Sequence, residues 1–205
     1  MNYLTLPIGE GCPEVVHAII EVPLGEVNKY EYDRKLHVFR LDRPLYSSVH
    51  YPGDYGFIPS TLGGDGDPLD ILMLAHHASF PGCLIAVRPV GVLDMLDQGL
   101  PDQKVLSVGV NDPHVKNIRN YRDIERSMLR EIEHFFSIYK ELEGKRTEVI
   151  GWRDQRQACE LIRECHERFN REGAESTRDI RPSVRPAPRL HATPGSGRRR
   201  VQRAR

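Results

Sequence analysis

Short apolar runs, broken at close intervals by glycine, proline and aspartate, fill the first half of this 205-residue chain. Alternating or continuous apolar runs of this length are typical of β-strands. The predicted strands are residues 15–22, 28–33, 36–41, 71–75, 83–95 and 104–108. Because turn residues separate them and no helical period intervenes, they predict an antiparallel barrel or sandwich.

The spacing of apolar residues changes in the second half of the chain. Residues 121–143 carry apolar side chains three and four positions apart, and Gly144 is placed to end that helix. A second amphipathic helix is predicted over residues 154–171. The sequence therefore predicts a β-rich α+β domain in which a barrel is flanked by two helices.

Charge divides the chain into a body, residues 1–175, and an Arg/Pro-rich tail, residues 176–205. The tail holds nine arginines and one acidic residue, a net charge of +8, and the body holds 20 basic and 28 acidic residues, a net charge of −8. With few large apolar side chains, the tail is predicted to be disordered. It is either a tether for nucleic acid, for an acidic partner or for the body, or a solvated appendage.

The cysteines and the N-terminal sequence indicate in which cellular compartment the protein functions. Cys12, Cys83, Cys159 and Cys165 show no C-x-x-C spacing, and two cysteines six residues apart on one helix lie about 9 Å apart along its axis, too far to bridge. We therefore expect reduced thiols. No basic start precedes an apolar core at the N-terminus, and no apolar run approaches ~18 residues, so a cytoplasmic protein without a membrane segment is predicted.

The segment Asp65-Gly66-Asp67-Pro68-Leu69-Asp70 places three carboxylates within six residues. Carboxylates this close cost free energy unless they are protonated, paired with cations or bound to metal. Oxygen ligands select hard ions, so Mg²⁺, Mn²⁺ or Ca²⁺ fits better than zinc. An EF-hand is excluded because Leu69, Asp70 and His76 stand where that loop needs an acid or amide, glycine and glutamate. A solvated acidic turn is the alternative.

A second acidic segment follows the long predicted strand. It contains Asp94, Asp97 and Asp102, and Lys104 opens the next strand. If the flanking strands are neighbours, both acidic segments open at the same end of the barrel and share ions. A surface hairpin is the alternative for this segment alone.

Further charged and phenolic side chains occur in predicted strands, at a strand end, in a turn-rich segment and late on the first predicted helix. They are Glu21, Lys29, Glu31, Arg43, Tyr51, Tyr55, Tyr139 and Lys140. Each also has an ordinary structural explanation as a strand pair, a core aromatic or a solvated side chain. Carboxylates recruit Mg²⁺, whereas cations and phenols bind phosphate oxygens, so the set as a whole indicates metal-dependent hydrolysis of a phosphoanhydride.

The chain resembles family I soluble inorganic pyrophosphatases of the bacterial type. The motifs that carry the resemblance are Glu21-Val22-Pro23, Lys29-Tyr30-Glu31, Asp42-Arg43, Tyr51-Pro52, Asp54-Tyr55-Gly56, Asp65-Gly66-Asp67-Pro68-Leu69-Asp70, Arg88-Pro89-Val90-Gly91, Asp97, Asp102, Lys104, His134-Phe135-Phe136 and Tyr139-Lys140. The resemblance extends from about residue 15 to residue 169. It implies an OB-like five-stranded barrel with helices and Mg²⁺-dependent hydrolysis of pyrophosphate to two phosphates, with Mn²⁺ as a substitute.

The resemblance also assigns metal ligands and a base. Asp65, Asp70 and Asp102 would hold the first metal, and Asp70 would also touch the second. Asp97, Asp102 and Glu31 would hold the ions that arrive with the substrate. Asp67 would be the general base toward a metal-bridged water.

Phosphate binding is assigned in the same way. The binding residues would be Lys29, Arg43, Tyr139 and Lys140, supported by Tyr55 and Lys104. Glu21 and Tyr51 match cavity positions with supporting roles. A body of this length is similar to hexamer-forming members, so a homohexamer is predicted.

Two other classes of function compete with hydrolysis. A barrel with a basic tail could bind nucleic acid, but a body of net charge −8 repels phosphate backbones unless the tail supplies the affinity. A scaffold that has lost catalysis is disfavoured, because the predicted ligands and cations are intact.

Overall fold

The computed structural model describes residues 1–173. Its strands are β1 (Val16–Val22), β2 (Asn28–Asp33), β3 (Val38–Pro44), β4 (Asp54–Phe57), β5 (Asp70–Leu74), β6 (Leu84–Asp97), β7 (Leu100–Gly109) and β8 (Thr147–Asp154), and its helices are α1 (Arg126–Ile138) and α2 (Gln155–Arg168). The predicted tail, and with it the boundary at residue 175, lies outside the described residues.

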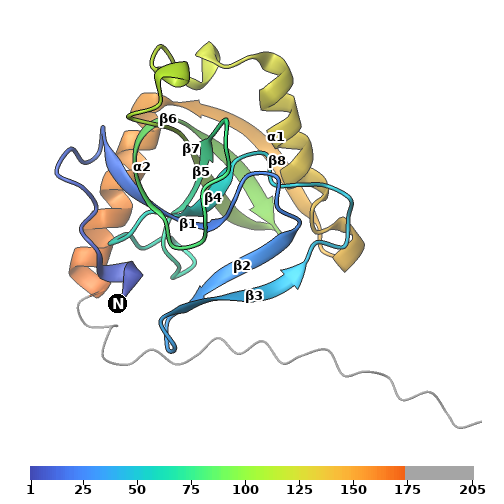
Figure 1. Cartoon of the computed structure of the whole chain (residues 1–205), viewed down its shortest axis with the longest axis horizontal. Coiled ribbons are helices and arrows are strands. Elements are labelled where there is room, and N and C mark those ends of the chain that lie inside the picture. The colour runs from blue at the N-terminus through green and yellow to red at the C-terminus, as the bar shows by residue number, and fades with distance from the viewer. Residues whose placement is uncertain (174–205) are drawn as a thin grey trace, which may run out of the picture.

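Five strands close on themselves to form the barrel. They are joined in the order β1–β4–β5–β7–β6, and β6 returns to pair with β1. Four of these five pairings are antiparallel, but β5 and β7 are parallel, a detail that the prediction of an antiparallel barrel did not include. The five-stranded barrel flanked by two helices is confirmed (Figure 1).

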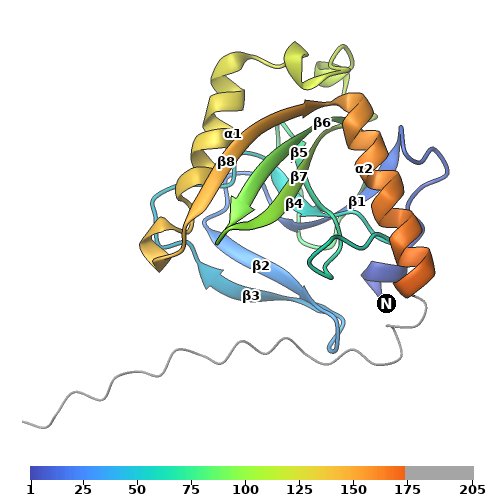
Figure 2. The same cartoon turned by 180° about the vertical axis from the view of Figure 1, so that it is seen from behind.

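The two helices cover different parts of the barrel. Figures 1 and 2 show α1 and α2 on opposite sides of the strands. Leu129, Ile132 and Phe136 of α1 join one buried apolar cluster, and Ala158 and Ile162 of α2 join another. Burial of these apolar faces is what stabilises helices of this length, because short helices are marginal in water on their own.

Helix ends agree with the local sequence. Asp154 caps α2 by accepting a hydrogen bond from the Gln157 N–H, and the Gln157 side chain accepts one from the Asp154 N–H. Gly144, with a φ of 71°, caps the separate turn Glu141–Glu143, whereas α1 itself ends at Ile138 with Tyr139 as its C-cap. The predicted helix 121–143 is shorter in the structure, because its first and last residues form separate 3-10 turns.

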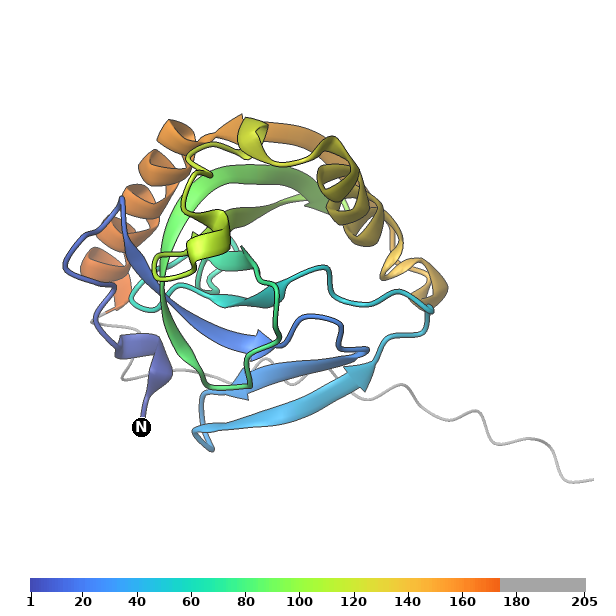
Figure 3. The same ribbon diagram turned by 45° about the horizontal axis from the view of Figure 1, so that its top comes forward.

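β2 and β3 form a separate two-stranded sheet, which Figure 3 shows beside the barrel rather than within it. Their aromatic side chains pack toward β1 and β4, where Tyr32 and Phe57 are buried together with Ile19. The Tyr32 N–H donates to Glu21 Oε1 of β1 at 2.7 Å. The hairpin is therefore held to the barrel by an aromatic cluster and by the half-buried carboxyl group of Glu21.

Two strands were not predicted. β4 lies in a segment rich in turn residues, and all four of its residues are buried, with Gly56 so close to Ile19 that an added Cβ would lie 1.9 Å from the Ile19 carbonyl oxygen. β8 pairs with the second half of β6, but the register skips Ile150, whose side chain is 60% exposed. A bulge of this kind interrupts the alternation by which a strand is predicted.

Candidate active site

The parallel pairing of β5 with β7 brings the two acidic segments together. Asp70 and Lys104 are register partners on these strands. Lys104 Nζ donates to Asp70 Oδ2 and, at 2.5 Å, to Asp102 Oδ1. The expectation that both acidic segments open at one end of the barrel is thus confirmed for Asp70 and Asp102.

Lys104 is buried, with 4% of its side chain exposed. Burial lowers the pKa of Lys104, but the charges of Asp70 and Asp102 raise it more, so the pKa is well above its ordinary value and the ammonium stays charged. For Asp102, burial and the charge of Asp70 raise the pKa despite Lys104. One ammonium between two carboxylates leaves this group with a net negative charge.

Two buried phenols lie beside these charges. Lys104 Nζ lies 5.8 Å from the ring centroid of Tyr55, and Lys140 Nζ lies 5.1 Å from that of Tyr139. Burial raises the pKa of both phenols, so both are neutral and can donate hydrogen bonds at neutral pH. Tyr51, which is also buried, packs against Tyr55 with ring centroids 5.5 Å apart.

Asp97 is the last residue of β6 and lies beside Lys140, which follows the end of α1. Lys140 Nζ donates to Asp97 Oδ2 at 2.6 Å. Burial raises the pKa of Asp97, but neighbouring groups, chiefly the ammonium groups of Lys140 and Lys104, together lower it more, so the carboxylate is held ionised. The other oxygen, Asp97 Oδ1, is buried without a hydrogen-bond partner among the described residues. A buried carboxylate oxygen in this state is a candidate ligand atom for a cation.

The β2–β3 hairpin contributes charges from outside the barrel. Lys29 and Arg43 are register partners on neighbouring strands, and Lys29 Nζ donates to Glu31 Oε1 at 2.5 Å. Arg43 Nε donates to Glu143 Oε1 at 2.7 Å. Burial raises the pKa of Glu21, in the adjacent β1, to about 8, so this carboxyl is largely protonated at neutral pH.

The acidic turn before β5 is bound by the tip of this hairpin. The Asp67 N–H donates to Asp65 Oδ1 at 3.0 Å, and Arg34 Nη2 donates to Asp67 Oδ1 at 2.5 Å. Desolvation and the nearby carboxylates of Asp65 and Asp70 raise the pKa of Asp67. Because 69% of the Asp67 side chain is exposed, water screens this effect.

The predicted metal ligands do not form a ready cluster of carboxylates. Among residues 1–173, no group of three or more His, Cys, Asp or Glu side chains is arranged to hold a metal ion. Cations separate the acids instead, in the pairs Lys29–Glu31, Lys104–Asp70, Lys104–Asp102 and Lys140–Asp97. Pairing with cations is one of the ways by which crowded carboxylates avoid repulsion.

Sequence reasoning missed several charged partners and took strand residues for a second acidic turn. Arg34 and Glu143 contact Asp67 and Arg43, and no local pattern marks either residue. Asp94 and Asp97 lie within β6 and Asp102 lies within β7, so the predicted second acidic turn is part of two paired strands. Arg153 binds both oxygens of Asp94 at 2.5 and 2.8 Å. Asp94 is therefore an ion-paired strand residue.

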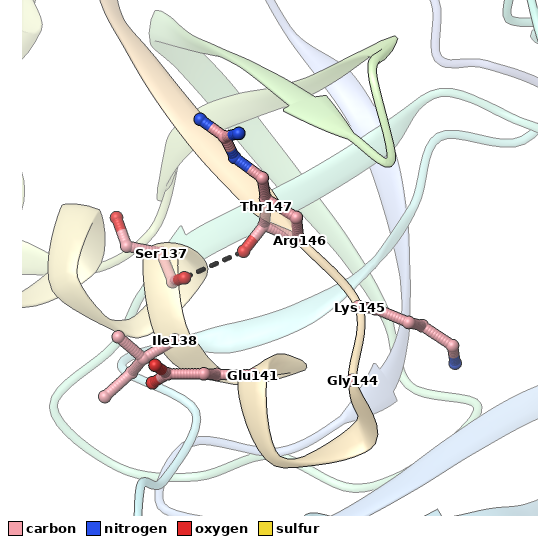
Figure 4. A pocket seen from close by; sticks show the side chains of 7 residues that line it. All are labelled: Ser137, Ile138, Glu141, Gly144, Lys145, Arg146 and Thr147. Atoms are coloured by element: carbon pink, nitrogen blue, oxygen red, sulfur yellow. Dashed lines mark hydrogen bonds between the residues drawn. The ribbon is translucent and has the colours of Figure 1, made fainter.

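A surface hollow of about 320 Å³ lies elsewhere, between the end of α1 and the start of β8. Figure 4 shows its lining, in which the Thr147 hydroxyl donates to the Ser137 carbonyl oxygen at 2.9 Å. None of the predicted site residues lines it. The gathered carboxylates, cations and phenols, rather than this hollow, form the candidate site.

None of the helices in the described part of the chain has both the length and the apolar character needed to cross a membrane.

Comparison with known proteins gives one consistent family. The family model described as inorganic pyrophosphatase matches residues 18–170. The inorganic pyrophosphatase of Halalkalibacterium halodurans is 47% identical over 157 residues, which are 77% of this chain and 96% of that protein. That of Thermus thermophilus is 48% identical over 171 residues, which are 82% of this chain and 98% of that protein.

Solved structures agree with these sequences. The crystal structure of inorganic pyrophosphatase from Thermus thermophilus superposes with a TM-score of 0.81 at 47% identity, covering 83% of this chain and 99% of that one. The enzyme from Helicobacter pylori superposes with a TM-score of 0.77 at 32% identity, covering 80% of this chain and 98% of that one. The similarity spans the barrel and both helices, and it covers nearly the whole of each relative.

The contacts of Lys104 predict its contribution to stability. Lys104→Met keeps the aliphatic stem but removes the buried ammonium, which leaves Asp70 and Asp102 facing each other. We expect the free energy of unfolding in metal-free buffer to fall by about 3 kcal/mol, measured by urea denaturation. Lys35→Met, at an exposed lysine without an ion pair among the described residues, is the control. Equal losses in the two variants would contradict a stabilising role for the buried ammonium.

Proposed function

Because the chain belongs to the inorganic pyrophosphatase family and is therefore an enzyme that hydrolyses pyrophosphate, we propose that the reaction takes place among the charges gathered around Lys104. The observation that carries this proposal is the bridge from Lys104 to Asp70 and Asp102. It brings two separate acidic segments to one place, where cations and phenols also converge. This is the mixture of groups that a phosphoanhydride and its metal ions require.

The enzyme is metal-dependent, as its family is, and we propose Mg²⁺ as the metal, with Mn²⁺ as a substitute. The proposed ligands are Glu31, Asp65, Asp70, Asp97 and Asp102. Their oxygen-only chemistry suits a hard cation, and Asp97 Oδ1, which has no hydrogen-bond partner within residues 1–173, supports a cation at that position. When bound, the metal ions would lower the pKa of the attacking water and neutralise negative charge on the phosphates.

Cationic and phenolic side chains would bind the substrate. The proposed set is Lys29, Arg43, Tyr55, Lys104, Tyr139 and Lys140. The cations offset the negative charge of pyrophosphate, and the neutral phenols donate hydrogen bonds to its oxygens. Glu21 and Tyr51 would support them, since Glu21 holds the hairpin that carries Lys29 and Tyr51 packs against Tyr55.

Asp67 is the proposed general base. Its Oδ1 accepts the hydrogen bond of Arg34, so Oδ2 is the atom we assign to accept the proton of the attacking water. The water oxygen bonds to one phosphorus as the bond from that phosphorus to the bridging oxygen breaks, and two phosphates leave. The exposed position of Asp67 fits this role, because a base must reach both water and substrate.

We further propose a cytoplasmic homohexamer. Large apolar side chains that one chain leaves exposed, such as Phe80, Leu100 and Ile150, support burial between subunits. The nucleic-acid alternative receives no support from the comparisons, and the negative charge of the body disfavours it. It is therefore not retained as a second function.

Removing the proposed base tests the mechanism. Asp67→Asn keeps the shape of the side chain but loses its basicity, so we expect phosphate release from pyrophosphate with Mg²⁺ to fall about 10²- to 10⁴-fold. Glu131→Gln, an exposed charge removal on α1, should retain full activity. Asp67→Asn with the activity of wild type would overturn the assignment of the base.

Metal binding can be tested apart from catalysis. If Asp97 Oδ1 is a ligand atom, Asp97→Ala should weaken Mg²⁺ binding at least tenfold, measured by isothermal titration without substrate. Chelation with EDTA should abolish phosphate release in wild type, and Mg²⁺ should raise its thermal midpoint, because a cation that binds the folded state stabilises it. Unchanged Mg²⁺ affinity in Asp97→Ala would remove this residue from the ligand set.

The proposed assembly predicts a particle of six times the mass of one chain. Analytical ultracentrifugation of the full chain over a range of concentrations measures this mass directly. Substituting Phe80, Leu100 and Ile150 together by serine should lower the mass if these exposed side chains lie between subunits. A monomeric wild type at micromolar concentration would refute the hexamer.

A further inference from the structure

Glu143 is a buried carboxylate that the mechanism so far leaves without a role. It lies in the 3-10 turn Glu141–Glu143, and only 6% of its side chain is exposed. Its Oε1 accepts a hydrogen bond from Arg43 Nε, and its Oε2 accepts one from Lys145 Nζ, each at 2.7 Å. Both carboxylate oxygens are thus used, and each binds a different cation.

The charge on Glu143 is held by these two partners. Burial raises the pKa of Glu143, but Lys145 and Arg43 lower it more, so the carboxylate is ionised at neutral pH. A buried charge that loses its partners is costly. The pair with Arg43 therefore resists separation far more than an exposed ion pair would.

Arg43 is restrained in a particular way by this contact. Its Nε donates to Glu143 and its Nη1 donates to Asp42, while 19% of its side chain is exposed. A guanidinium group is planar, so fixing Nε and Nη1 also fixes the direction of Nη2. Among the described residues Nη2 has no hydrogen-bond partner in the structure, which leaves it available to an anion.

The contact also joins two parts of the proposed phosphate site. Arg43 belongs to the hairpin outside the barrel, and Glu143 follows Tyr139 and Lys140 at the end of α1. The residues of the pair are 100 positions apart in sequence. Their ion pair therefore sets the position of the hairpin cation relative to the two phosphate-binding residues after α1.

We propose that Glu143 is a positioning residue that orients the Arg43 guanidinium for pyrophosphate. The proposal rests on the proposed role of Arg43 in binding the substrate. Glu143 does not touch pyrophosphate and acts through Arg43. Its removal should therefore impair binding of the substrate more than the chemical step, because a residue that contributes equal binding to substrate and transition state affects KM and leaves kcat nearly unchanged.

Steady-state kinetics on the full-length enzyme with Mg²⁺ tests the proposal. Glu143→Ala should raise KM for pyrophosphate at least fivefold and change kcat less than twofold. Glu143→Gln, whose amide oxygen can still accept a hydrogen bond from Arg43 Nε, should show a smaller rise in KM. If Glu143→Ala does not fold, Glu143→Gln alone tests the proposal. Glu141→Gln is the matched control, because Glu141 lies in the same turn, is exposed and makes no ion pair among the described residues.

A double-mutant cycle separates this role from a general effect on folding. Arg43→Ala should raise KM by itself, and adding Glu143→Ala to it should raise KM no further, because the group to be positioned is already absent. Thermal midpoints of all variants show whether stability changes in parallel.

The outcomes distinguish this inference from the proposed function. If Arg43→Ala raises KM but Glu143→Ala and Glu143→Gln match Glu141→Gln, Glu143 is not a positioning residue, and the proposed role of Arg43 stands. If Glu143→Ala raises KM by the same factor in wild type and in Arg43→Ala, Glu143 acts on substrate binding independently of Arg43, and the inference is overturned. If Arg43→Ala leaves KM unchanged, the role of Arg43 fails, and the inference fails with it.

Discussion

Repulsion among carboxylates is the constraint that the structure must satisfy before anything else at this end of the barrel. Asp70 and Asp102 come from neighbouring strands, and the buried ammonium of Lys104 lies between them. Lys140 and Arg34 hold Asp97 and Asp67 in the same manner. Each of these four aspartates thus has a cation beside it, and Lys104 and Lys140 are also among the cations proposed to bind phosphate.

If these cations bind phosphate as proposed, the same side chains serve both stability and function. A cation that pairs with a carboxylate can exchange it for a phosphate oxygen if a metal ion binds the carboxylate instead. The carboxylates, which are paired with ammonium and guanidinium groups in this structure, would then be held by metal instead.

The site also depends on elements that do not belong to the barrel. The β2–β3 hairpin supplies Lys29, Glu31 and Arg43, yet it shares no hydrogen-bonded sheet with the other strands. It is held by the aromatic cluster around Tyr32, by the bond from Tyr32 to Glu21, and by contacts at its two ends. Tertiary packing therefore determines the distance between the charged side chains of the hairpin and those of the barrel.

The sequence by itself determined the features that arise from neighbouring residues. Alternation placed most strands, the three- and four-residue spacing placed both helices, and the density of aspartates around Asp65 indicated where the proposed site lies. The sequence pattern did not predict β4, whose residues are typical of turns, or β8, in which the bulge at Ile150 interrupts the alternation. Only the tertiary structure decided that β5 and β7 run parallel, that Arg34 binds Asp67 and that Glu143 binds Arg43. These contacts join residues tens of positions apart, and such contacts leave no period or motif in the sequence, because they follow from how whole elements pack.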